Sequence, residues 1–147
     1  MIKVEDMMTR NPHTLLRSHL LIDAKHTMEA LDIRHIPIID GDRHLLGIIT
    51  QRDVLAAQDS SLHEVQEEQS FTLNTPIHEV MCTNVMSVTP KAGLKETALY
   101  MQKHKVGCLP VVDKGRLVGI ITNSDFVSIA ISLLELQEEV EPEEMED

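Results

Sequence analysis

The chain has 147 residues, of which 42% are hydrophobic and only 2% aromatic, with no Trp, one Tyr and two Phe. That length allows one ordinary domain, or two very small units that must share a core. The net charge is −11. The scarcity of aromatic side chains argues against the base-stacking platforms that bind single-stranded nucleic acid, so we expect no nucleic-acid partner.

The acidic residues are unevenly distributed along the chain. Segments 54–90 and 135–147 hold five and eight acidic residues respectively and no Lys or Arg. Segments 1–53 and 91–134 hold the other 11 acidic residues and all 13 basic ones. The acidity therefore belongs to connecting segments, and it does not argue against an anionic ligand on the rest of the chain.

Cysteine usage and hydropathy indicate a cytoplasmic protein. Cys82 and Cys108 lie in unlike contexts and match no metal-ligand spacing. The first ten residues lack the apolar core of a signal peptide, and the longest apolar stretch, 126–136, is too short and too interrupted to cross a bilayer. We therefore expect a reduced thiol pair and no membrane insertion.

A duplication relates the two halves of the chain. Pairs 73 positions apart are Met8 and Met81, Met28 and Met101, Pro37 and Pro110, and Asp40 and Asp113. Pairs 72 positions apart are Gly47 and Gly119, Thr50 and Thr122, and Asp53 and Asp125. A constant offset with one deletion in a turn indicates an internal repeat.

Each copy predicts a strand, a helix, two strands and a second helix, after a short leading helix at 4–8 in the first copy and a helix restart at Thr75-Pro76 in the second. The first copy places these elements at 14–16, 21–33, 36–39, 45–49 and 53–57, with a turn at 40–43. The second places them at 85–89, 94–106, 109–112 and 117–121, with a turn at 113–115 and a longer helix from 125.

Between and after the copies the pattern changes. Ser61 and Glu64 predict a short capped helix that carries Leu62 and Val65, and 67–75 reads as linker. The helix after Asp125 is apolar on nearly every side, which predicts burial within the chain or against a second copy, and we expect a homodimer. Residues 135–147 read as a solvated acidic tail.

In each copy, the last predicted strand leads into the second helix through the sequence GIITQRD (47–53) or GIITNSD (119–125). A Thr followed three residues later by Asp is a helix-capping signal. The same geometry suits a nucleotide, because a helix N-terminus attracts phosphate and a carboxylate accepts hydrogen bonds from ribose hydroxyls. The motif alone leaves both interpretations open.

The combined motifs resemble a known family. Two copies of a leading helix ending in Met, a helix, IPIID or LPVVD, and GIIT with its Asp are similar to the tandem cystathionine β-synthase (CBS) repeats of a Bateman module, especially stand-alone bacterial pairs of the acetoin-utilisation type. The resemblance runs from Val4 to about Leu134, with no catalytic domain attached. It implies an α/β (α+β) fold of two pseudo-two-fold-related β-α-β-β-α repeats: repeat 1 at 4–58, a linker at 59–76, repeat 2 at 77–134 and a tail at 135–147.

The family binds AMP, ADP, ATP, S-adenosylmethionine or related adenosyl ligands in two clefts. The resemblance implies that the GIIT-segment Asp holds the ribose, that its Thr lies near ribose or phosphate, and that basic residues before the IP pair meet phosphate. The candidate nucleotide-binding residues are Arg34, His35, Thr50, Arg52, Asp53, Thr122, Ser124 and Asp125. We expect an adenosyl nucleotide as ligand, with Mg²⁺ as a companion ion, and no tightly bound cofactor.

The candidate residues predict two unequal clefts. The first cleft is expected to receive phosphates on Arg34, His35 and Arg52, beside Asp53. The second has Gly107, Cys108 and Ser124 at the corresponding positions, so it must borrow charge from the other repeat or favour a ligand with little negative charge.

Other functions have little support in the sequence. No GxSxG, Walker loop or convincing carboxylate pair suggests an enzyme, and the eight histidines form no HxH or HxxxH pair for a metal. We expect a regulatory module that senses its ligand and signals to an enzyme or transporter. The alternative is a scaffolding pair whose Thr and Asp residues only cap helices.

Overall fold

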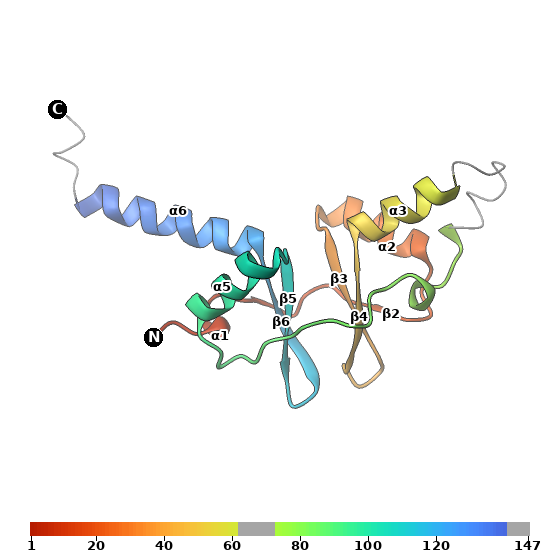
Figure 1. The fold of residues 1–147 in the computed structure, drawn as a ribbon, viewed down its shortest axis with the longest axis horizontal. Helices are drawn as coiled ribbons and strands as arrows, with labels where there is room; N and C mark the ends of the chain where they lie inside the picture. The colour runs from red at the N-terminus through yellow and green to blue at the C-terminus, as the bar shows by residue number, and fades with distance from the viewer. Residues whose placement is uncertain (62–72, 141–147) are drawn as a thin grey trace.

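The computed structural model describes residues 1–61 and 73–140. Two sheets stand side by side at the centre, and the helices are divided between two lobes (Figure 1). In chain order the elements are α1 (Val4–Met7), β1 (Thr9–Arg10), β2 (Leu15–Leu16), α2 (Leu21–Leu31), β3 (His35–Ile39), β4 (Leu45–Thr50), α3 (Gln51–Ser61), η1 (Ile77–Glu79), α5 (Leu94–His104), β5 (Cys108–Asp113), β6 (Arg116–Thr122) and α6 (Asn123–Val140). The expected α/β class and the two repeats are confirmed.

The two sheets have equivalent topologies. One has the order β2-β3-β4 and the other β1-β6-β5, and an antiparallel bridge between Ile48 and Cys82 extends the first sheet where β1 extends the second. Each is built on an antiparallel hairpin, with Pro37 opposite Ile48 in one and Pro110 opposite Ile120 in the other. β2 pairs parallel with β3, and an isolated parallel bridge from Val88 to Val111 takes its place in the second sheet. The repeat seen in the sequence is therefore a repeat of hydrogen-bond register.

Some expected elements differ in the structure. The strand expected at 85–89 is reduced to the bridge at Val88, and the helix expected after Pro76 is the single 3-10 turn η1. Helices α3 and α6 begin two residues before Asp53 and Asp125, directly after the capping Thr. α6 continues to Val140, so the first residues of the expected tail are helical. Ser61 is the last residue of α3, and the remainder of the capped helix expected there, with Glu64, lies outside the described ranges, as do residues 141–147.

Each repeat has a leading segment, which runs through α1 and β1 in the first repeat and through η1 to Cys82 in the second. Each leading segment packs on the other repeat. The Val4 amide donates to the Ala92 carbonyl at 2.9 Å, and Val4 is buried in one cluster with Leu94. In the same way the Ile77 amide donates to the His19 carbonyl at 2.8 Å, and Ile77 is buried against the first repeat. Figure 1 shows both connecting segments crossing between the lobes. Each core therefore needs residues from the other half of the chain.

This packing of each leading segment on the other repeat is an exchange of leading segments. The glycine of each GIIT segment leaves room for the segment that packs against it. A Cβ at Gly47 would lie 2.7 Å from the Cys82 carbonyl oxygen, and a Cβ at Gly119 would lie 3.0 Å from the Thr9 carbonyl oxygen. The leading segment passes too close to the strand for any side chain. The two sheets also contact each other directly, through a small cluster of Ile48, Cys108 and Ile120.

Candidate functional site

Both expected capping boxes are present. The Thr50 amide donates to Asp53 Oδ2 at 2.9 Å, and the Asp53 amide donates to Thr50 Oγ1 at 3.2 Å. The equivalent bonds between Thr122 and Asp125 measure 2.9 and 3.3 Å. A carboxylate has about four lone-pair sites, so capping leaves acceptor capacity on both aspartates. The capping role is therefore established, and it does not exclude a ligand.

Asp125 lies in a cavity of about 480 Å³ that both repeats build. Repeat 2 contributes the start of α6, with Thr122, Asn123 and Ser124. Repeat 1 contributes Arg34 from the loop before β3, and further lining residues are Thr9, Pro12, His13, Asp32, Ile33, His35, Gly107 and Ile120. No ion pair of Arg34 occurs within the described ranges. The cavity thus combines a capped carboxylate with a guanidinium from the opposite repeat.

Asp53 lies in a second cavity, of about 290 Å³. Its polar lining includes Thr50, Asp53 and Asn84. The remaining lining residues are Cys82, Val85, Met86 and Ile48, the β5 end with Val106, Gly107, Cys108 and Leu109, and His35. Aliphatic and sulfur-containing side chains dominate this cavity.

His35 and Gly107 line both cavities and so form a shared wall. A Cβ at Gly107 would lie 3.6 Å from His35 Nε2. Burial and the Arg34 charge lower the pKa of His35, and the Asp53 carboxylate only partly opposes them. The imidazole between the cavities is therefore neutral at neutral pH.

The thiol of Cys108 is unreactive. Burial, and then the charge of Asp125, raise its pKa to about 12. A thiol with that pKa is uncharged at neutral pH and is a poor nucleophile.

The three residues expected together in the first cleft do not share one cavity in the structure. Arg34 was expected to accompany Asp53, but it lines the cavity of Asp125. The register explains this, because His35 pairs with Thr50 and places Arg34 beyond the end of the hairpin. Arg52 is exposed and lines neither cavity as described. The expected grouping of Arg34, His35 and Arg52 in one cleft is therefore wrong, and only His35 reaches both sites.

Sequence reasoning missed Thr9 and Cys82, which lie in the two leading segments. They are 73 positions apart, each directly after a duplicated Met. Thr9 lines the Asp125 cavity and Cys82 the Asp53 cavity. The repeat offset was the signal for their equivalence, but the exchange of leading segments determines which cavity each one enters.

Residues 1–61 and 73–140 lack two further features. No cluster of three or more His, Cys, Asp or Glu side chains there is arranged to hold a metal ion. Within the same ranges, no helix has the length and apolar character needed to span a membrane.

Comparison with known proteins identifies the architecture. The family model described as "CBS domain" matches residues 4–60 and 77–132. A crystal structure from Vibrio cholerae that carries the name acetoin utilization protein (AcuB) is 69% identical, with a TM-score of 0.83, over 95% of this chain and 97% of that one.

Two solved structures with ligands also match. CBSX2 in complex with AMP is 28% identical, with a TM-score of 0.77, over 90% of this chain and 98% of that one. The CBS domain pair of protein MJ0100, in complex with 5′-methylthioadenosine and S-adenosyl-L-methionine, is 27% identical with a TM-score of 0.73, over 90% and 98% of the two chains. The chain therefore belongs to the CBS domain family, and its two CBS domains assemble as a Bateman module of the acetoin-utilisation type.

Proposed function

We propose that this module binds adenosyl ligands in its two cavities and signals their presence to a partner protein, an enzyme or a transporter. The observation that carries the proposal is the meeting of Asp125 from one repeat with Arg34 from the other in a single cavity. AMP in the CBSX2 complex and the two adenosyl compounds in the MJ0100 complex support the ligand class.

The chemistry follows from the side chains. Asp125 and Asp53 accept hydrogen bonds from ribose hydroxyls, and Arg34 binds phosphate through its planar fork of donors. Mg²⁺ enters only as the companion of a nucleotide phosphate. A reducing cytoplasm suits the two free cysteines, Cys82 and Cys108.

Signalling follows from the shared construction of the cavities. Each cavity is lined by both repeats, so a ligand favours whichever arrangement of the repeats contacts it best. The arrangement of the repeats in turn determines the surface that α2 and α3 of the first repeat and α5 and α6 of the second present together. A partner that recognises that surface therefore responds to the ligand.

A thermal-shift series tests the proposal. AMP with and without Mg²⁺, 5′-methylthioadenosine and S-adenosylmethionine are each added to the protein and to Asp53→Asn and Asp125→Asn. A ligand at 100 times its dissociation constant adds about 2.7 kcal/mol of stability. The matched control is Asp113→Asn, at the exposed last residue of β5, which lines neither cavity. If no adenosyl compound shifts the melting temperature, the scaffolding alternative is favoured.

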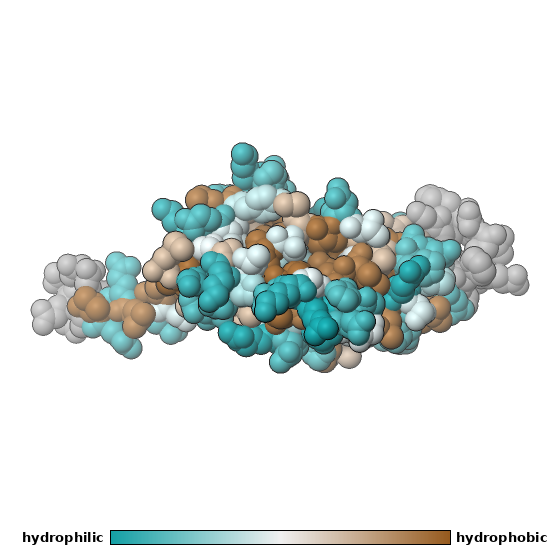
Figure 2. Space-filling view, turned by 90° about the horizontal axis from the view of Figure 1, so that it is seen from below, coloured by the Kyte–Doolittle hydropathy of each residue, from teal (hydrophilic) through white to brown (hydrophobic). Residues whose placement is uncertain are grey.

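We also propose a homodimer, formed through α6. Val127, Ile131 and Leu134 follow one helix face and are exposed, at 57%, 51% and 59%. Figure 2 shows hydrophobic side chains on the part of α6 that projects from the body. A monomer with so much exposed apolar surface on one helix is unusual, and a partner would cover it.

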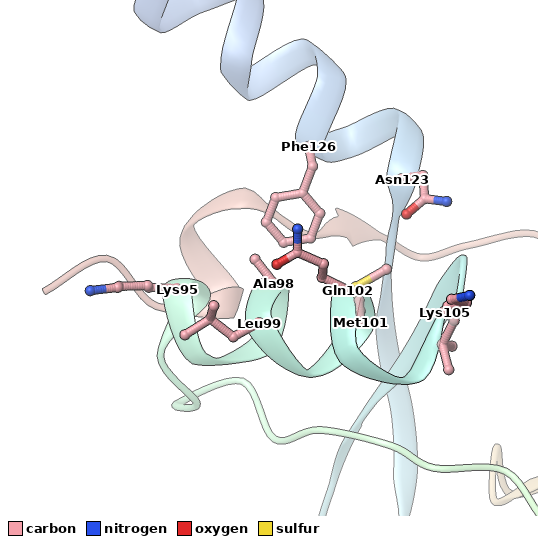
Figure 3. A pocket seen from close by; sticks show the side chains of 9 residues that line it. Lys95, Ala98, Leu99, Met101, Gln102, Lys105, Asn123 and Phe126 are labelled. Carbon is pink, nitrogen blue, oxygen red and sulfur yellow. The ribbon is translucent and has the colours of Figure 1, made fainter.

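The groove between α5 and α6 suits the same helix of a second copy. It encloses about 590 Å³ and is lined by apolar side chains that include Leu99 and Phe126. Lys95 and Lys105 lie at its two ends (Figure 3). The far half of α6 offers Ile131 and Leu134 beside three glutamates, at 135, 138 and 139. An apolar helix face with acidic neighbours complements this groove in shape and charge.

A further inference from the structure

We infer that the two cavities hold two chemically different adenosyl ligands at the same time: one with a phosphate in the Asp125 cavity, and one with an uncharged thioether at the 5′ position in the Asp53 cavity. The inference rests on the proposed function and adds the ligand class of each cavity.

The Asp125 cavity has the donors that a phosphate requires. Arg34 lines it without an ion pair in the described parts of the chain, and Ser124 adds a hydroxyl group, whereas the hydroxyls of Thr9 and Thr122 already donate to Asp125. Asp32 and Asp125 both line this cavity, and their carboxylates would repel an anion. The guanidinium of Arg34 therefore decides whether a phosphate can enter, because it is the fixed positive charge of the cavity.

The Asp53 cavity lacks such a charge. No Lys or Arg is among its described lining residues, and 62–72 and 141–147 contain none in their sequence. The imidazole of His35 is neutral there, and the thiol of Cys108 is uncharged. Asp53 thus contributes the only formal charge of the described lining at neutral pH. A phosphate placed beside it would be desolvated next to a like charge with no counterion, which is strongly unfavourable.

The same cavity offers a good surface for a thioether. Its wall includes Cys82, Met86 and Cys108, whose polarisable sulfur atoms pack well against apolar and sulfur-containing groups. Asp53 and Asn84 remain available for the ribose and the base. A neutral adenosine ligand therefore satisfies the polar groups without introducing an unpaired charge.

The two cavities differ at two pairs of positions that the internal repeat makes equivalent. Arg34 corresponds to Gly107, and Thr9 corresponds to Cys82, each pair 73 positions apart. In both pairs the polar member is the one that belongs to the Asp125 cavity alone. The Asp125 cavity therefore has a cation and a hydroxyl at the positions where the other repeat supplies a glycine and a thiol.

Arg52 is the residue that competes with this inference. It is exposed and immediately precedes Asp53, although it does not line the cavity. If Arg52 supplied a charge to a ligand at Asp53, both cavities would take phosphates. Arg52→Gln is therefore the discriminating control for Arg34→Gln, since both remove one guanidinium.

Calorimetric titration with AMP and 5′-methylthioadenosine, singly and in sequence, tests the inference. We expect one equivalent of each, with 5′-methylthioadenosine binding undiminished to AMP-saturated protein. Arg34→Gln should weaken AMP about ten- to a hundredfold, the loss typical of a charge-assisted hydrogen bond, and leave 5′-methylthioadenosine unchanged. Asp53→Asn should weaken 5′-methylthioadenosine alone, Asp125→Asn should weaken AMP alone, and Arg52→Gln should weaken neither.

A gain-of-function variant keeps the test independent of lost stability. Met86 lines the Asp53 cavity and is 56% exposed, so Met86→Lys adds a cation there without disturbing the core. We expect this variant to bind a second equivalent of AMP. Competition between the two ligands for one site, weaker AMP binding by Arg52→Gln, or no second equivalent in Met86→Lys would overturn the sorting of ligands. If neither compound binds the unmodified protein, the proposed function fails as well.

Discussion

Thr9 Oγ1 donates a 2.9 Å hydrogen bond to Asp125 Oδ1, which joins two residues 116 positions apart in the chain. Thr9 belongs to the exchanged leading segment, and Asp125 lies in the first turn of α6. The carboxylate is thus oriented by the first repeat and by its own capping Thr122. Cys82 takes the place of Thr9 beside Asp53, so the two aspartates are held in different ways.

Replacing Thr9 tests this orientation. Thr9→Val keeps the shape of the side chain and removes the donor, so the free energy of unfolding should fall by about 0.5–1.5 kcal/mol, toward the lower end because the bond is exposed. AMP affinity should fall too, since Asp125 loses its second fixed partner. Urea denaturation and calorimetry measure the two effects. Thr9→Ser retains the hydroxyl and should behave as the unmodified protein; a Ser variant as weak as the Val variant would contradict this account.

The glycines under the leading segments should be intolerant of a methyl group. Gly47→Ala would place Cβ 2.7 Å from a backbone oxygen, so we expect a loss of about 1–3 kcal/mol in the free energy of unfolding. Gly41→Ala is the matched control, because nothing lies within 4 Å of a Cβ there. Denaturant titration compares the two. The lower entropy of the unfolded chain should make Gly41→Ala neutral or slightly stabilising, so equal losses in the two variants would contradict crowding as the cause.

His35 should make the fold sensitive to mild acid. Its pKa in the folded protein is lowered from 6.5, first by burial and then by Arg34, against the pull of Asp53. The unfolded chain therefore binds the proton more readily, and the free energy of unfolding falls as pH drops below about 6.5. His35→Gln should flatten this dependence in chemical denaturation between pH 7 and 5. His26→Gln, at an exposed position of α2, serves as the control and should retain it.

Self-association should depend on the exposed face of α6. Ile131→Glu places a charge in the centre of the proposed interface, so it should convert a dimer into a monomer in sedimentation at micromolar concentration. Ser132→Glu adds the same charge at the next exposed position of the helix, which already carries a polar residue. We expect it to leave the dimer intact. A monomeric unmodified protein, or equal effects of the two variants, would contradict the interface.

Local patterns in the sequence predicted the hairpins and capping boxes well. The apolar runs around Pro37 and Pro110 and the Thr-to-Asp spacing determine hydrogen bonds within a few residues, and both are confirmed. The structure of the segment before Pro90 was harder to predict. Its β-branched residues are typical of a strand, but only Val88 pairs with another strand. Strand content there depends on a distant neighbour, which local propensity does not encode.

The cavities were harder to predict for the same reason. Arg34 stands next to His35 in the sequence and shares a repeat with Asp53, so proximity along the chain suggested one cleft. The side chain lines the other cavity because the two repeats meet face to face around their pseudo-two-fold. Which charge serves which carboxylate is decided by the docking of the repeats, and no motif within one repeat contains that information.

The exchange of leading segments also constrains how the chain folds during synthesis. Val4 leaves the ribosome well before Leu94 and Ile121, yet it is buried in one cluster with them. The first repeat likewise remains unfinished until Ile77 has emerged. We therefore expect nascent chains to stay incompletely folded until nearly all of the second repeat is made.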